Sequence, residues 1–86
     1  MLSITDLKDF IDLDIETVHI VIGATKLPAV EATALARQLL ATENGISLLH
    51  HMYRDQISDS AAQFQMSRAH ELRQEFAYFS RKYPLP

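Results

Sequence analysis

The sequence contains no cysteine and only two glycines, Gly23 and Gly45. Without cysteine, disulfides, thiolate metal sites and thiol nucleophiles are excluded, and the composition fits a cytosolic protein better than a small secreted one. Two isolated glycines also cannot form the glycine-rich loops that cradle phosphates. The remaining possibilities are a packed domain that binds through its surface, or a site built from histidine, carboxylate or hydroxyl groups.

Long apolar runs are missing as well. The uncharged stretch from Val18 to Thr25 is far shorter than the ~20 residues needed to span a bilayer. The chain opens with acid, at Asp6, where a secretory signal would carry basic residues. With 86 residues, 48% of them hydrophobic and 22% charged, we expect one folded domain, residues 1–86, in the cytoplasm.

Charge is unevenly distributed along the chain, whose net charge is −3. Residues 1–31 hold six acids and two lysines, whereas residues 32–86 hold five acids and six bases. No strongly basic segment is present, so nucleic acid is not the expected partner. The acidic first part is either a solvated face or a surface for a basic partner, such as the carboxy-terminal bases of a second copy.

Helical periodicity runs through the chain and predicts an all-α bundle of four to five helices. Helices are expected over residues 3–14, 15–22, 28–43, 46–57 and 60–83, with Gly45 as the left-handed cap of the third. Residues 17–22 are rich in Val and Ile, so a short strand is the alternative prediction to a helix there. No second strand is predicted for it to pair with, so helix is favoured.

The longest predicted helix, residues 60–83, contains no glycine or proline before Pro84. Ser58–Ser60 supplies candidate caps, and Ser60 with Gln63 matches a capping box. Seven residues, all apolar or small except Gln65, recur at spacings of three and four and form one ridge, namely Ala62, Gln65, Ala69, Leu72, Phe76, Phe79 and Tyr83. As one rod of about 35 Å, this helix would expose more ridge than so small a body can cover.

That ridge predicts a non-enzymatic protein–protein interaction module, acting as an adaptor, a chaperone-like protein or a regulatory subunit. Self-association into a homodimer through the long helix is the expected mode. The predicted interface residues are Phe64, Leu72, Phe76, Tyr78, Phe79 and Tyr83. No residue pattern indicates a cofactor or a catalytic centre.

One alternative is DNA binding. Residues 61–68 resemble the first helix, the turn and the start of the second helix of a helix-turn-helix, which would occupy residues 57–76. The resemblance fails downstream, because Glu71 and Gln74 stand at positions that should be apolar.

A metal-binding bundle is the second alternative. Glu16 and His19 match half of the di-iron carboxylate motif, and His51 with Asp55 lies one helical turn apart. Two ligands do not complete a site, so a homodimer would have to supply the others. His50 and His51 are otherwise expected on a polar helix face.

Overall fold

The computed structural model describes residues 13–86, and every regular element in this part of the chain is an α-helix. The elements are α2 (Ile15–Thr25), α3 (Ala29–Leu40), α4 (Glu43–Ala62) and α5 (Met66–Lys82). The predicted all-α bundle is therefore confirmed, and the strand alternative for residues 17–22 is wrong. The helix expected over residues 3–14 lies, except for its last two residues, outside the described part of the chain.

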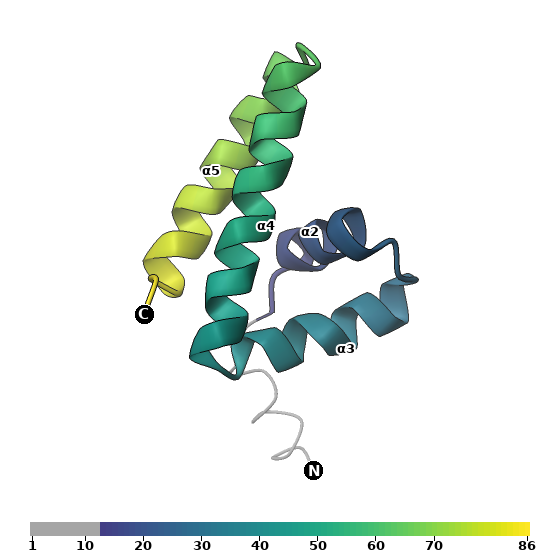
Figure 1. The fold of residues 1–86 in the computed structure, drawn as a ribbon, viewed down its shortest axis with the longest axis vertical. Coiled ribbons are helices and arrows are strands. Elements are labelled where there is room, and N and C mark those ends of the chain that lie inside the picture. The colour runs from purple at the N-terminus through teal and green to yellow at the C-terminus, as the bar shows by residue number, and fades with distance from the viewer. Residues whose placement is uncertain (1–12) are drawn as a thin grey trace.

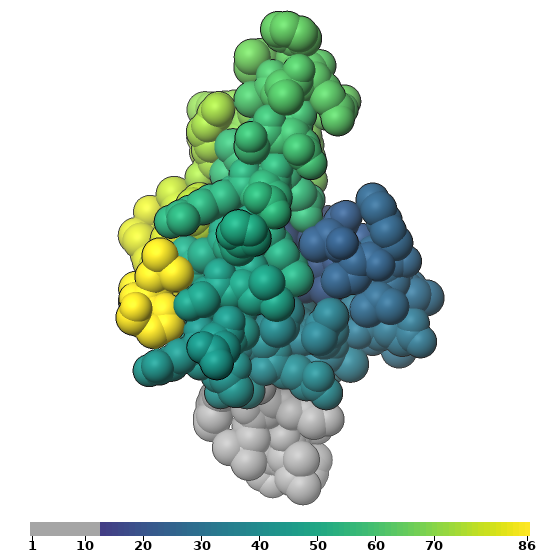
Figure 2. Space-filling model, viewed as in Figure 1, coloured from purple at the N-terminus to yellow at the C-terminus, as the bar shows by residue number. Residues whose placement is uncertain are grey.

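Helix α4 is the central element of the fold (Figure 1). Helix α5 runs antiparallel along its length, while α2 and α3 form a V on the other side of α4 in this view, with α3 meeting the start of α4 and α2 its middle (Figure 1). The free end of the α4–α5 hairpin projects beyond α2 and α3, as Figure 2 shows. This projection makes the molecule elongated, with extents of 47 × 27 × 21 Å. We call residues 62–67 the hairpin end.

The β-branched residues of α2 are helical because they are buried against α3 and α4. Val18, Ile20 and Val21 are all 5% exposed or less, and burial of several apolar side chains outweighs the few tenths of a kcal/mol that each loses in helix propensity. The helix also continues through Gly23, where a connection was predicted. It ends at Lys26, whose positive φ of 65° and N–H bond to the Ile22 carbonyl form a left-handed cap.

Gly45 does not cap α3 as predicted, because it lies in the first turn of α4. Thr42 is the amino-terminal cap, its hydroxyl accepting a hydrogen bond from the Gly45 N–H at 2.9 Å. A Cβ on Gly45 would stand 2.5 Å from the Leu39 Cα. Glycine is needed here because two helices approach closely, and not because of its backbone freedom.

The single helix predicted over residues 60–83 is wrong, since the chain turns at residues 63–65. Phe64 adopts a left-handed φ of 62°. The Gln65 N–H donates to the Ser60 carbonyl at 2.8 Å, and the Phe64 N–H donates to the Ala61 carbonyl at 3.0 Å. These two bonds form a Schellman motif in which phenylalanine occupies the position usually held by glycine.

Helix α4 also continues through the predicted cap at Ser58–Ser60. Ser60 is only 7% exposed, because this last part of α4 packs along α5. Residues 58–60 are therefore helical because of the packing of α4 on α5, although their side chains favour cap positions.

No single helix within residues 13–86 has both the length and the apolar character to cross a bilayer, although α2 and α3, bent by 107°, meet those criteria as a pair.

Candidate functional site

The structure divides the six predicted interface residues into three groups. Leu72 and Phe79 are 1% exposed and belong to the core of the monomer. Phe76 and Tyr83 are partly buried against that core. Phe64 and Tyr78, at 83% and 50% exposure, are the two whose rings a partner can reach freely.

The ridge is covered mainly by α4, which was not predicted to reach so far along it. Tyr53 of α4 stacks on Phe76 with ring centroids 5.4 Å apart and contacts Phe79 at 5.0 Å. The prediction that the ridge lies uncovered on one long helix is therefore wrong. Any interface on α5 must use side chains outside this aromatic cluster.

The hairpin end is the first such surface. It carries Phe64 and the 56% exposed Met66, and it lies where the molecule projects furthest (Figure 2). A left-handed conformation costs a residue with a Cβ roughly 1–2 kcal/mol, and the phenyl ring gains no burial in return. Backbone strain of this kind clusters at functional positions.

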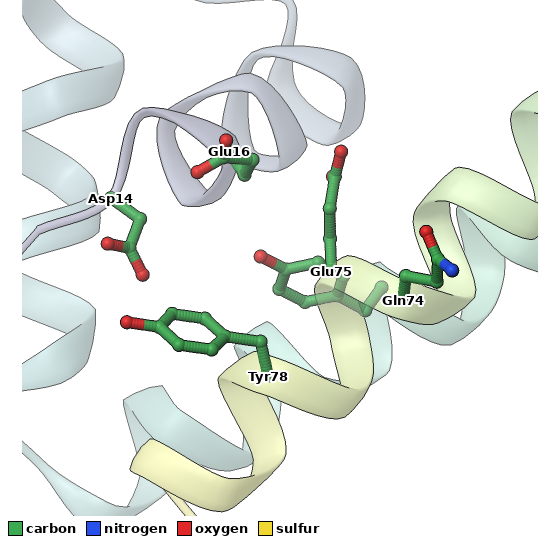
Figure 3. A pocket seen from close by; sticks show the side chains of 6 residues that line it. Asp14, Glu16, Gln74, Glu75 and Tyr78 are labelled. Carbon is green, nitrogen blue, oxygen red and sulfur yellow. The ribbon is translucent and has the colours of Figure 1, made fainter.

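The second surface is a pocket of about 420 Å³ where the start of α2 faces α4 and α5. We call it the acid–tyrosine pocket, and its lining residues are Asp14, Glu16, Tyr53, Gln74, Glu75 and Tyr78 (Figure 3). The Asp14 carboxylate points toward the Tyr78 ring, and Glu75 extends from α5 toward α2, which carries Glu16 (Figure 3). Side chains from three helices or their caps thus converge on one hollow.

Burial changes the acidity of two lining residues. Desolvation raises the pKa of Glu75 above its usual value, with Glu16 and Glu71 adding to the rise and Arg68 opposing it. Desolvation likewise raises the pKa of Tyr53 to about 12. The Tyr53 hydroxyl is therefore neutral at physiological pH, and it shares a 3.4 Å hydrogen bond with the Thr17 hydroxyl.

A cation of the chain itself lies beside this pocket. The Lys82 ammonium is 3.2 Å from an Asp14 carboxylate oxygen and 5.2 Å from the centre of the Tyr78 ring. Both the ion pair and the cation–π contact involve lining residues of the pocket. The pocket's own groups are thus already arranged to stabilise an ammonium ion.

The histidines do not form a metal site among residues 13–86, where no group of three or more potential ligands is close enough to hold an ion. His51 and Asp55 are exposed and 3.6 Å apart. The prediction that His50 lies on a polar face is wrong, because it is 4% exposed. Its Nε2 is 2.6 Å from the Tyr83 carbonyl. His50 is buried because α4 is covered on two sides and therefore buries a wider face than predicted.

The helix-turn-helix resemblance locates the turn correctly, because α5 begins at Met66. The two helices then run antiparallel side by side (Figure 1), whereas a helix-turn-helix crosses at about 90–120°. Arg68, which would start the second helix, pairs with Glu71 at 3.6 Å. The geometry of a DNA-reading helix is therefore not present at residues 57–76.

The acid–tyrosine pocket was missed from sequence because its residues come from three separate segments. The acidic excess of residues 1–31 was the one available signal, and it did not identify Glu75 or Tyr78 as neighbours. Comparisons with protein-family models, with curated proteins and with solved structures found no match to this chain.

Proposed function

We propose that this chain is a non-enzymatic protein-binding module that forms a homodimer through the hairpin end. The observation that carries this proposal is Phe64, which combines a strained left-handed backbone with 83% exposure. A partner that covered the ring would return roughly 1.5–3 kcal/mol of transfer free energy. The missing cysteines support a cytoplasmic setting for this module.

A second copy is the favoured partner because the hairpin end is compatible with itself. Residues 60–67 carry no charged side chain, so two identical ends can approach without like-charge repulsion. Asp59 and Arg68 flank this neutral stretch with opposite signs. In a two-fold arrangement every contact between two different residues occurs twice, so Asp59 of each copy can face Arg68 of the other.

The exposed apolar area at the hairpin end is small for a permanent dimer, so the association should be weak and concentration-dependent. Sedimentation velocity from about 10 µM to 1 mM covers the range expected for such an interface. We expect the average mass to rise over this range for the wild-type protein.

The decisive variant is Phe64→Gly. Glycine adopts the left-handed conformation without strain. The free energy of unfolding of this variant should therefore rise by up to about 1 kcal/mol, which would shift its unfolding to a higher urea concentration. It should also remain monomeric, because the ring is gone. Val30→Ala is the matched control, since Val30 is 82% exposed on α3, away from the hairpin end.

A Phe64→Gly protein that associates as tightly as the wild type contradicts the proposal. So does a Val30→Ala protein that loses association to the same extent. Phe64→Asn gives a further check, because asparagine tolerates the left-handed region but leaves no apolar ring.

A further inference from the structure

We propose that the acid–tyrosine pocket binds a lysine or arginine side chain from a basic segment of a partner protein. The pocket is a second binding site, separate from the hairpin end. Tyr78 follows Met66 by twelve positions along α5, which corresponds to about 18 Å along the helix. The inference therefore does not rest on self-association through Phe64.

Two of the three carboxylates in the pocket have no ion-pair partner among residues 13–86. Asp14 is paired with Lys82, but Glu16 and Glu75 form no ion pair with any described residue. Glu75 is partly buried, and its raised pKa reflects the cost of holding an unpaired carboxylate there. A cation that entered the pocket would remove this penalty, so the site selects for positive charge.

The aromatic groups favour the same kind of ligand. Tyr78 presents its ring at the pocket with half of its surface exposed. Cations bind over such faces within about 6 Å of the ring centre. Lys82 gives an example within the chain, because its ammonium contacts both the Asp14 carboxylate and the Tyr78 ring.

Tyr53 adds a buried polar atom to the lining. The residue is 1% exposed, and its hydroxyl has Thr17 as its hydrogen-bond partner. When Tyr53 donates to Thr17, the Tyr53 oxygen keeps lone pairs that can accept a hydrogen from an ammonium or guanidinium group. Since its pKa is about 12, this oxygen acts as a neutral acceptor.

A protein side chain fits the pocket better than other cationic or charged ligands. A metal ion would need three ligands held together, and the described residues provide no such group. A nucleic acid would be repelled by the carboxylates. Gln74 offers both an amide donor and an amide acceptor in the lining, which are the groups that a peptide backbone requires beside its basic side chain.

The test is a ¹H–¹⁵N chemical-shift titration of the full chain with blocked pentalysine, using blocked pentaglutamine as the neutral probe. We expect saturable shifts at residues 14–17 and 74–78 with pentalysine alone. Glu16→Gln combined with Glu75→Gln should weaken binding tenfold or more. Tyr78→Leu should weaken it several-fold by removing the ring face.

The control is Glu31→Gln combined with Glu43→Gln, which removes the same formal charge from exposed positions in the first turns of α3 and α4. Its affinity should stay within about twofold of the wild type, because these carboxylates are screened by solvent. Equal losses in the two double variants would overturn the proposal, since binding would then follow net charge. Unchanged binding in the pocket variant would overturn it as well.

The diamine cadaverine separates a protein segment from a free amine. We expect it to bind at least tenfold more weakly than pentalysine, because it lacks the backbone that Gln74 contacts. Equal affinity would overturn the assignment to a protein partner. A monomeric Phe64→Gly protein that still binds pentalysine separates this inference from the proposed homodimer.

Discussion

Gly45 is the single residue on which the junction of α3 and α4 depends most directly. Its place in the first turn of α4 brings its Cα against the Leu39 backbone, and backbone cannot move aside as a side chain can. The sequence identified this position as special but gave the wrong reason. A helix cap and a close helix approach both require glycine, and only the packed structure distinguishes them.

Gly45→Ala should therefore lower the free energy of unfolding by about 2 kcal/mol or more, as expected for overpacking. Gly23→Ala is the matched control, because its Cβ would meet only the Gln56 side chain, at 2.7 Å from Oε1. Alanine inside α2 gains up to about 1 kcal/mol in helix propensity, so the two effects should nearly cancel. Urea titrations of both variants measure the difference, and equal stability of the two would contradict the close approach.

The break between α4 and α5 shows how far a periodic pattern can predict helices. The ridge is correct from Ala69 onward, where Ala69, Leu72 and Phe79 are all buried. Its extension toward residue 60 relied on Ala62 and Gln65, which are both exposed. Neither is a strong apolar signal, and a turn whose left-handed residue is phenylalanine has no recognisable sequence pattern.

His50 fastens the carboxy-terminal end of α5 to α4. Its Nε2 donates to the Tyr83 carbonyl, and its ring meets Phe76 and Phe79 edge-on at 5.4 and 5.2 Å. The Tyr83 carbonyl lies past the last turn of α5, where helical partners run out. One side chain thus supplies both packing and a hydrogen bond at the point where α5 would otherwise fray.

His50→Leu should cost about 1–3 kcal/mol, since the bond to the Tyr83 carbonyl is lost while apolar contacts remain. Amides in the last turn of α5 should then exchange with solvent faster than those near Met66. His50→Gln is the control, because its amide can still donate a hydrogen bond. Hydrogen exchange followed by NMR measures the amide exchange rates at both ends of α5. A uniform increase in these rates along α5 would show that His50 stabilises the core as a whole and not the end of this helix.

For the whole molecule, the sequence predicted the class of fold and not the sites. The all-α class is predicted from apolar residues that recur at helical spacing throughout the chain, so an error at the boundary of one helix does not change the prediction. The acid–tyrosine pocket depends on Glu16 and Glu75, which lie 59 positions apart in the chain. Nothing local links them, and only the packing of both α2 and α5 on α4 makes them neighbours.

That packing also affects how the stability of the molecule depends on pH. Glu75 faces Glu16 from α2 and Glu71 from its own helix, with Arg68 and His19 as the opposing groups. Burial first, and then these two carboxylates, raise its pKa in the folded state above the usual value of a glutamate carboxyl. The folded state therefore binds the proton more tightly than the unfolded state, and protonation of Glu75 stabilises the fold.

Glu75→Gln should consequently be more stable than the wild type at pH 7, where the partly buried carboxylate is charged. The gain should stay below about 1 kcal/mol, because solvent screens a partly exposed group. As the pH falls toward the usual carboxyl pKa, the wild-type carboxyl takes up its proton and the difference in stability between the two proteins should shrink. Urea midpoints measured from pH 7 to 4.5 test this, and Glu43→Gln, at an exposed position, should show no gain at pH 7. A Glu75→Gln protein less stable than the wild type at pH 7 would mean that an attractive partner, and not burial, dominates at this carboxylate.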